Sequence, residues 1–188
     1  MSASTILCTR DSVKTYLGLS GGTYDDALDA LIAAAGEAIE RACGRRFGLV
    51  EYTEYHDGGE DRVVLRHRPV TDLTAVWDDP DRNFGDATLI DPGEIVLDAY
   101  AGVIILPKST FSRGVRNVKA TYTAGYDSVP DDAAQACRML VAAWFHRGRE
   151  AGDGLDQRGA AETTQRFAAE PWPPAATEIL GRYRDHRV

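Results

Sequence analysis

The segment Val115–Arg149 constrains the fold most, because it joins an expected strand to a strongly amphipathic helix through a single turn. In its first part apolar and polar residues alternate at a period close to two, which predicts a strand with one wetter face that Gly125 ends. Ser128 and Asp131 then have the spacing of a capping box, and Pro130 lies where a missing backbone N–H costs nothing. These signals predict a helix that begins beside this proline.

The expected helix over residues 130–147 carries an apolar stripe along one face. Its members recur every three or four residues and are Ala133, Ala136, Cys137, Leu140, Val141, Trp144 and Phe145. Trp144 and Phe145 could line a pocket beside His146, but their helical spacing favours a place in the core. The stripe therefore predicts that another helix packs against this one.

Two further helices are expected near the amino terminus, over residues 10–18 and 25–43. Thr23 and Asp26 repeat the capping-box spacing at the start of the second of these helices. The second helix is rich in alanine, and small side chains let another helix approach closely. We therefore expect it to pack against the helix over residues 130–147.

Between these helices, over residues 48–123, the apolar residues change to a period of two, which predicts a small, mostly antiparallel β insertion. The strongest β prediction is a hairpin of residues 49–56 and 62–67, joined by a tight turn at Asp57–Glu60. Weaker strands are expected over residues 87–90, 94–97 and 103–106.

Composition limits the classes of function. A chain of 188 residues with 44% hydrophobic side chains can form one domain with a real core. Its 29 acidic and 21 basic residues give a net charge of -8, which argues against a protein that holds nucleic acid by its phosphates. There is no long apolar run and no leader-like amino terminus, so neither a membrane span nor a secretory signal is expected, and the protein should remain in a cytosol.

No pattern points to a catalytic, cofactor-binding or metal site. The carboxylates of the acidic loop Asp78–Asn83 could suggest a calcium-binding loop. Glycine and glutamate are missing where such a loop needs them, so a solvated turn is expected. The four histidines lack metal-ligand spacing, and His56 and His67 are expected to form a cross-strand pair on a wet face. Nucleophile elbows, P-loops and dinucleotide fingerprints are absent from the sequence.

The three cysteines, Cys8, Cys43 and Cys137, are an odd number and form no C-x-x-C pair. Two of them lie on the apolar faces of expected helices. We therefore expect all three to be small buried hydrophobic residues.

After Arg149 the character of the chain changes. Residues 150–170 contain three glycines and few large apolar side chains, which predicts a flexible arm. The prolines of Pro171–Pro174 then introduce a last helix, which either folds back on its own domain or docks on a partner, with Trp172 as the anchor. The residues expected to bind a partner are Trp172, Ile179, Leu180, Arg182, Tyr183, Arg184 and Arg187.

Three segments occur in a distinctive order. They are the helix end Ile39–Phe47, the strand Val63–Val76 with its Arg68–Pro69 step, and the turn Tyr122–Tyr126 before Val129–Pro130. In this order and spacing the chain resembles the head–tail connector (adaptor) proteins of tailed phages and phage-like gene transfer agents. The resemblance implies a connector-like domain over residues 1–149, followed over residues 150–188 by a flexible arm and a docking helix.

The fold expected on this basis is α+β: a small helical bundle with an inserted, mostly antiparallel β-region and an extended C-terminal arm ending in a helix. The function implied is that of a structural virion protein without catalysis, located in the neck of a virion or phage-like particle. Its copies would form a twelvefold ring between the portal protein and a tail-side neck or stopper protein. DNA would only pass through the ring, and no membrane would be involved.

Two other classes of function are left open by the residues. One is a non-catalytic intracellular binding module with a groove at the helix–sheet junction, and the other is a hydrolase that uses scattered carboxylates. A large ring in a mass measurement would favour the connector, and a strict monomer would favour the module. A carboxylate pair with a perturbed pKa in a deep pocket would favour the hydrolase.

Overall fold

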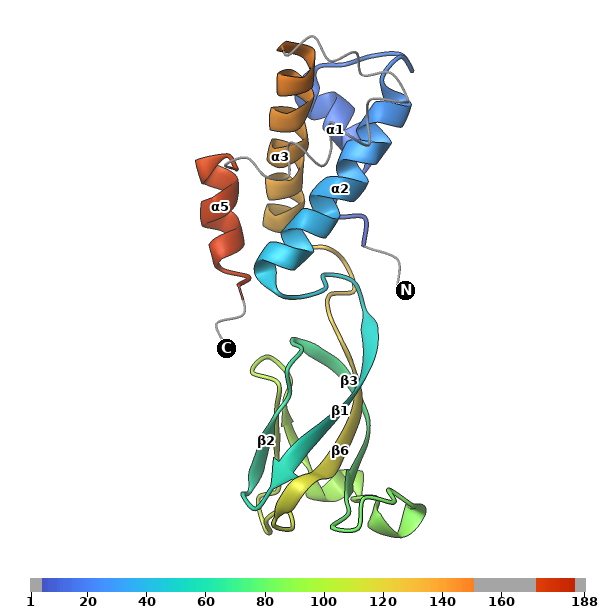
Figure 1. Cartoon of the computed structure of the whole chain (residues 1–188), viewed down its shortest axis with the longest axis vertical. Helices are drawn as coiled ribbons and strands as arrows, with labels where there is room; N and C mark the ends of the chain where they lie inside the picture. Colours follow the sequence, from blue (N-terminus) through green and yellow to red (C-terminus); the bar gives the residue numbers. More distant parts are fainter. Residues whose placement is uncertain (1–4, 151–171, 185–188) are drawn as a thin grey trace. The chain divides into compact units, whose positions relative to one another are not determined.

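The structure, a computed structural model, describes residues 5–150 and 172–184 (Figure 1). Its helices are α1 (Arg10–Leu17), α2 (Asp25–Cys43), α3 (Asp131–Glu150) and α5 (Pro174–Gly181). The described residues of 1–47 and 128–188 form a helical unit, and Gly48–Asp127 form a β-unit. The α+β class with an inserted β-region is therefore confirmed. Of the arm expected over residues 150–170, all but Glu150, the last residue of α3, lies outside the described residues.

Helix α1 has a side-chain N-cap, but α2 does not have the cap that its sequence predicts. The hydroxyl of Thr9 accepts a hydrogen bond from the Ser12 N–H and caps α1. Helix α2 instead has Tyr24 at its N-cap position, without a side-chain cap bond, so the capping box expected at Thr23 is wrong. Asp25 lies in the first turn of α2 and binds Lys14 at 2.7 Å. A carboxylate there suits the positive end of the helix dipole, and the salt bridge ties α1 to α2.

Helix α3 begins at Asp131 and not before it. The carbonyl oxygen of Pro130 accepts the first helical hydrogen bond, from the Ala134 N–H at 2.9 Å. Pro130 therefore directly precedes the first helical residue. Its ring fixes φ, but its carbonyl is free to accept the first hydrogen bond of the helix. The helix runs three residues beyond the expected end at residue 147.

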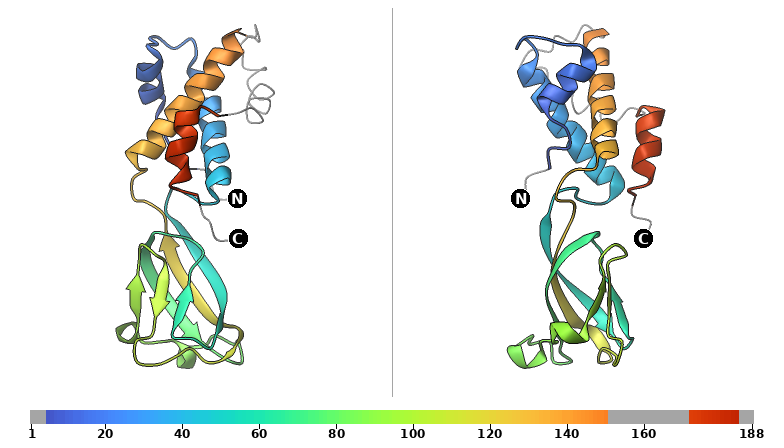
Figure 2. Two further views of the ribbon diagram at one scale, coloured as in Figure 1. Left: turned by 90° about the vertical axis from the view of Figure 1, so that its left-hand side faces the viewer. Right: turned by 180° about the vertical axis from the view of Figure 1, so that it is seen from behind.

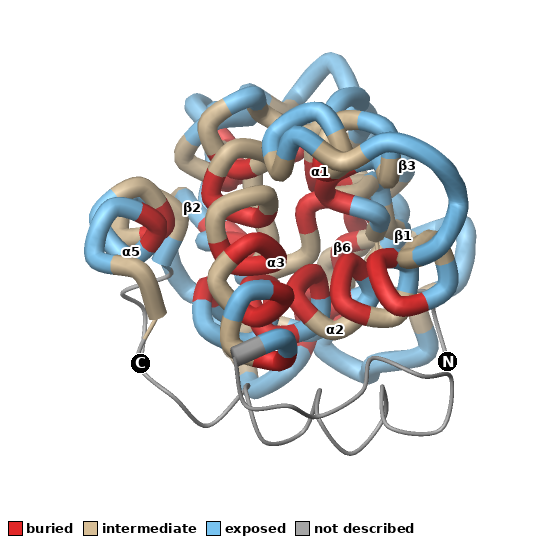
Figure 3. Tube along the Cα trace, turned by 90° about the horizontal axis from the view of Figure 1, so that it is seen from above, coloured by how far each residue is buried: buried red, intermediate tan, exposed pale blue. Residues whose placement is uncertain are grey.

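The core of the helical unit is built from the apolar stripes of α2 and α3, which pack against each other as expected. Figure 3 shows buried residues recurring along both helices. Leu28, Ile39, Leu140 and Trp144 are among the largest fully buried side chains, so the prediction that Trp144 belongs to the core is confirmed. Among the described residues, no helix combines the length and the apolar composition that crossing a bilayer requires.

The three cysteines are free and buried, as predicted. Cys8 and Cys137 lie with their sulfur atoms 3.1 Å apart, and the Cys43 sulfur lies 3.8 Å from the carbonyl oxygen of Leu180. The hydrogen bond with the Cys8 thiol, and after it burial, raise the pKa of Cys137. The thiols thus fill space between elements of the helical unit.

The β-unit consists of two three-stranded antiparallel sheets (Figure 2). One has the order β1-β6-β3 and the other β2-β5-β4. The strands are β1 (Val50–Gly58), β2 (Arg62–Val64), β3 (Val70–Asp78), β4 (Val96–Asp98), β5 (Val103–Ile105) and β6 (Gly114–Ala124). The prediction of a strand over residues 87–90 is wrong. Residues 86–88 form a short 3-10 helix, and only Leu89 bridges to Trp77.

The expected hairpin of residues 49–56 and 62–67 is wrong in its pairing. β1 bonds to β6 and β2 bonds to β5, so the two strands belong to different sheets. The chain leaves the first sheet at Gly58, whose N–H donates to the side-chain oxygen of Asn117 at 3.0 Å. A Cβ atom on Gly58 would lie 2.2 Å from the Ser112 carbonyl oxygen, so this approach of two backbones requires glycine.

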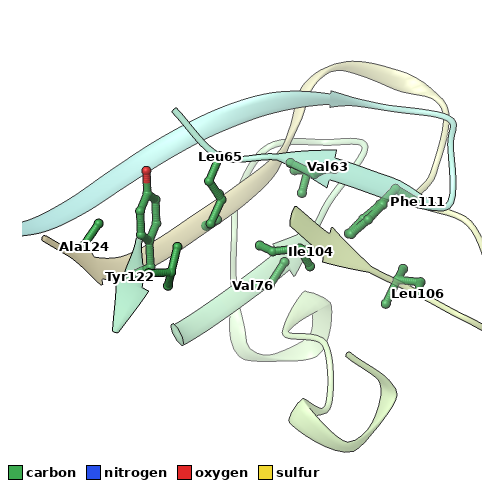
Figure 4. Packing of buried hydrophobic residues seen from close by; sticks show 11 residues of the cluster. Val63, Leu65, Val76, Ile104, Leu106, Phe111, Tyr122 and Ala124 are labelled. Carbon is green, nitrogen blue, oxygen red and sulfur yellow. The ribbon is translucent and has the colours of Figure 1, made fainter. Parts of the chain in front are cut away.

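A single apolar core lies between the two sheets (Figure 4). Val63 and Ile104 enter it from the second sheet, and Val76, Val118 and Tyr122 enter it from the first. Alternation along each strand sends the next residue to the opposite face. Each sheet therefore has one core face and one solvent face.

We predict that Leu140→Asp prevents the helical unit from folding. The side chain is fully buried, and an isolated carboxylate there would cost several kcal/mol against a typical stability of about 5–15 kcal/mol. Circular dichroism and thermal melting test this, with His146→Asp, an exposed position of the same helix, as the matched control. The control should lose less than about 1 kcal/mol. An unchanged melting curve for Leu140→Asp would remove α3 from the core.

Candidate functional site

Helix α5 packs against its own helical unit, alongside α3 in the views of Figures 1 and 2. It starts at Pro174, where a proline suits the first helical turn. Ala176 and Leu180 form its buried side, and Leu180 is only 3% exposed. The described part of the C-terminal segment therefore folds back, which is one of the two alternatives that the sequence leaves open.

Tyr183 fastens the end of this segment. Its hydroxyl donates a short hydrogen bond to the carboxylate of Asp132 in the first turn of α3. Its ring lies 5.3 Å from the ring of Phe47, centroid to centroid. Leu180, in the last turn of α5, and Tyr183, just after the helix, thus both contact the helical unit.

The residues predicted to bind a partner fall into two groups. Leu180 and Tyr183 contact the helical unit itself, so only a detached helix could offer them to a partner. Arg182 and Arg184 are exposed, while Trp172 and Ile179 are half-buried. Arg187 lies outside the described residues. A partner-binding role for the exposed members stays a prediction.

A buried carboxylate that sequence reasoning missed lies in the β-unit. Glu54 is 7% exposed and accepts hydrogen bonds from the Tyr122 hydroxyl at 2.8 Å and from the Arg66 N–H at 3.1 Å. The Nε2 atoms of His56 and His67 lie 3.0 and 3.7 Å from its oxygen atoms. The prediction that the two histidines pair on a wet face is wrong, because both approach a buried acid. Alternation along β1, which puts Glu54 on the face of Tyr52 and His56, was the available signal.

The protonation states and hydrogen bonds of this cluster suit a structural role. Burial raises the pKa of the Glu54 carboxyl, but hydrogen bonds from His56, Tyr122 and the Arg66 backbone outweigh burial and hold the pKa below its ordinary value. Burial and the neighbouring carboxylate raise the pKa of Tyr122. Glu54 is therefore ionised and Tyr122 protonated at neutral pH. The Tyr122 oxygen also accepts from the His67 N–H at 3.1 Å, so the cluster joins β6 to β1 and to the segment between β2 and β3.

A polar pocket of about 580 Å³ lies beside this cluster, between β1 and β2. Its lining combines acidic residues, such as Glu54 and Asp57, with Arg62, Arg66 and Arg116. Glu54 accepts several hydrogen bonds, and Arg62 forms a salt bridge with Asp61 at 2.9 Å. Among residues 5–150 and 172–184, no group of three or more His, Cys, Asp or Glu side chains is placed to hold a metal ion.

The acidic loop after β3 is exposed over residues 80–83, as expected of a solvated turn, but its Asp79 is buried and organises it. Its carboxylate accepts hydrogen bonds from the backbone N–H groups of Asp81, Asn83 and Phe84 at 2.9, 3.0 and 2.7 Å. Burial raises the pKa of this carboxyl, but these backbone donors outweigh burial, so the pKa is lowered. The side chain of Asp79 therefore serves as the loop's own acceptor.

We predict that Glu54→Gln destabilises the β-unit by about 1–3 kcal/mol at neutral pH, because an amide cannot accept all the bonds that the carboxylate accepts. The folded pKa of Glu54 lies below its ordinary value of 4.5. Its ionised form therefore adds stability above that value, and this stability is lost as the pH falls through the folded pKa. Urea unfolding from pH 7 to pH 3 should show the wild type approaching the variant in acid. Glu51→Gln, an exposed position of the same strand, should change little.

We predict that Leu180→Ala lowers the free energy of unfolding by about 2–5 kcal/mol, because it leaves a cavity under α5. Thermal melting of the full chain measures the loss, with the exposed Glu178→Ala on the same helix as control. An equal melting temperature for Leu180→Ala and wild type would show that α5 detaches in solution. The apolar residues of the helix would then all be available to a partner.

Comparisons with solved structures show where this fold occurs. A chain from the neck of an empty GTA particle, computed with C6 symmetry, matches with a TM-score of 0.60 and 23% identity, covering 100% of this chain and 95% of that chain. A chain from the virion of a native gene transfer agent (GTA) particle matches with a TM-score of 0.58, 22% identity and the same coverage. A third, from the neck of a native GTA particle computed with C12 symmetry, has a TM-score of 0.55, 21% identity and coverage of 90% and 94%. At these identities the likeness establishes a shared fold.

The sequence provides the evidence for the family. No curated protein matches the chain. The family model of the head completion protein matches residues 6–186, which includes both units and nearly the whole sequence. The chain therefore belongs to the head completion protein family.

Proposed function

We propose that the chain is one subunit of a ring that joins the portal to the tail and lets DNA pass. As a head–tail connector it is a structural virion protein and lies in the particle neck. The match of the head completion protein family to residues 6–186 is the observation that carries this role. The fold shared with GTA neck chains supports it.

Several copies form the ring in this proposal. The two GTA necks that contain similar chains were computed with C6 and C12 symmetry, and both symmetries are compatible with twelve copies. Closed rings arise when one surface of a subunit binds a different surface of the next and the rotation closes. We therefore propose twelve copies, with the portal on one side and a tail-side neck or stopper protein on the other.

The charge of the chain fits a passage for DNA. With 29 acidic against 21 basic side chains, the chain has little net charge with which to release counterions from DNA. An acidic wall repels phosphate, so DNA can slide along it without being held. The duplex is thus cargo in transit and not a ligand.

The exposed side of α5 is the proposed contact with the portal. Leu180 and Tyr183 hold the helix on its own unit, which fixes Arg182 and Arg184 at an exposed end. Arginine side chains can form bidentate bonds with acidic groups of a partner, and half-buried Trp172 can add apolar contact. In this proposal residues 150–188 end in a docking element that is also part of the helical unit.

The two buried carboxylates of the β-unit argue against the hydrolase alternative. A general acid at neutral pH needs a raised pKa, whereas the pKa values of Glu54 and Asp79 are both lowered. Each carboxylate already accepts several internal hydrogen bonds. Their arrangement suits a stabilising role.

The test is a mass measurement of the chain alone and with the portal protein of its own particle. We expect a ring, in solution or on the portal, with twelve copies. Arg182→Glu combined with Arg184→Glu should weaken portal attachment at least about tenfold and leave the melting temperature within a few degrees.

Arg41→Glu is the matched control, because it reverses an exposed arginine on α2. It should bind the portal like the wild type. A strict monomer that never binds a portal would contradict the connector role and favour the binding module. Portal binding that survives the double reversal would move the docking site away from α5.

A further inference from the structure

Large side chains cross the solvent face of sheet β1-β6-β3 in one row. Lys119 of β6 pairs with Tyr55 of β1 and with Trp77 of β3, and Leu89 bridges to Trp77. Directly paired residues of antiparallel strands point to the same side, so these four share the solvent face. The rings of Tyr55 and Phe84 lie 5.4 Å apart. We name this surface the aromatic–cationic face: Tyr55, Trp77, Phe84, Leu89, Arg116 and Lys119.

Two cations are held over these rings. The Nζ atom of Lys119 lies 4.1 Å from the centroid of the Trp77 ring, and the guanidinium carbon of Arg116 lies 5.4 Å from that of Tyr55. The Arg116 N–H donates to the Asp57 carboxylate at 2.8 Å, which fixes the bulge that presents this arginine. Within the described part of the chain, neither cation has an ion-pair partner. Both can therefore pair with acidic groups from outside.

The solvent face of sheet β2-β5-β4 has a different chemistry. Val64, Val103 and Asp98 form one row across it, and Arg62, Ile105 and Val96 form the next. Val64 is 43% exposed and Val96 51%. Arg62 is paired with Asp61, which leaves Asp98 as the net charge of this surface. We name it the aliphatic–acidic face: Val64, Val96, Asp98, Val103 and Ile105.

The outer faces of the two sheets lie on either side of the apolar core (Figure 4), and they meet at the pocket between β1 and β2, which Tyr55, Arg116 and Val64 all line. We propose that neighbouring copies of this chain contact each other through them, the aromatic–cationic face of one copy against the aliphatic–acidic face of the next. A contact between two different surfaces of one unit is a head-to-tail contact, which can close into a ring. The inference rests on the proposed ring and adds the residues that form it.

A second copy suits these surfaces in both charge and apolar character. Each copy carries a net charge of -8, so copies repel one another unless their contact surfaces are complementary. Lys119 and Arg116 of one copy against Asp98 of the next offset that repulsion where the copies meet. Trp77 and Leu89 then cover the exposed valines, which removes apolar surface from water.

Charge reversal tests the pairing. Lys119→Glu or Asp98→Lys alone should raise the protein concentration needed for assembly at least about tenfold, because like charges then meet at every contact. An equimolar mixture of the two variants should restore rings in which they alternate. In that mixture Lys119 meets Asp98 at one contact, and the reversed pair meets at the other. The double variant should also assemble alone. Native mass spectrometry gives the composition of each ring.

Three controls separate assembly from folding. Lys108→Glu makes the same charge change at an exposed loop position and should assemble normally. Asp98→Asn keeps an acceptor for the Ala101 N–H, which the Asp98 carboxylate binds at 2.9 Å, and removes only the charge, so its effect should be intermediate. Melting curves of all variants should stay close to that of the wild type.

The outcomes distinguish this contact from the ring itself. Rings that persist in both Lys119→Glu and Asp98→Lys would overturn the contact and leave the ring standing. If these variants keep their rings but lose portal or tail-side binding, the two faces would belong to another partner, and the contact between copies would again be overturned. A wild-type chain that forms no ring, alone or on the portal, would overturn the proposed function and this contact together. Rings that are lost in each single variant and restored in their mixture and in the double variant would support the pairing.

Discussion

The double pairing of β6 is the constraint on which the β-unit depends. This strand bonds to β1 along one edge and to β3 along the other, and its residues alternate between core and solvent. Tyr122 therefore points inward, where it donates to the buried Glu54, and Lys119 points outward, over Trp77. One strand thus sets both the internal polar cluster and the chemistry of the outer surface, so a shift of one residue would exchange them.

In the proposed attachment, the C-terminal helix combines two tasks that a flexible tether would separate. Its buried side, centred on Leu180, adds to the stability of the helical unit, and its exposed end presents arginines. A binding element that is already ordered loses less conformational entropy on docking than a free helix does. On this proposal stability and attachment can be altered independently, because different residues of the same segment carry them.

Assembly of an acidic subunit into a ring poses an electrostatic problem. Copies with a net charge of -8 repel, yet a DNA passage benefits from the same acidity. In the proposed contact, the cations gathered on the outer face of one sheet and the carboxylate on the outer face of the other reconcile the two requirements. Attraction is then confined to the contact surfaces, and the rest of the subunit keeps its negative charge. Such contacts weaken with salt in proportion to their exposure.

The sequence by itself determined the local elements and the class of fold. Periodicity identified α2 to the residue, the strand that precedes α3 and the core position of Trp144, because these follow from which residues share a face. Only the tertiary structure decided that β1 pairs with β6, that His56 and His67 meet at Glu54, and that α5 rests on α3. Period and spacing are properties of one segment. Pairing is a choice among segments far apart in the chain, and it depends on which combination buries the apolar faces together and satisfies the polar groups that go with them.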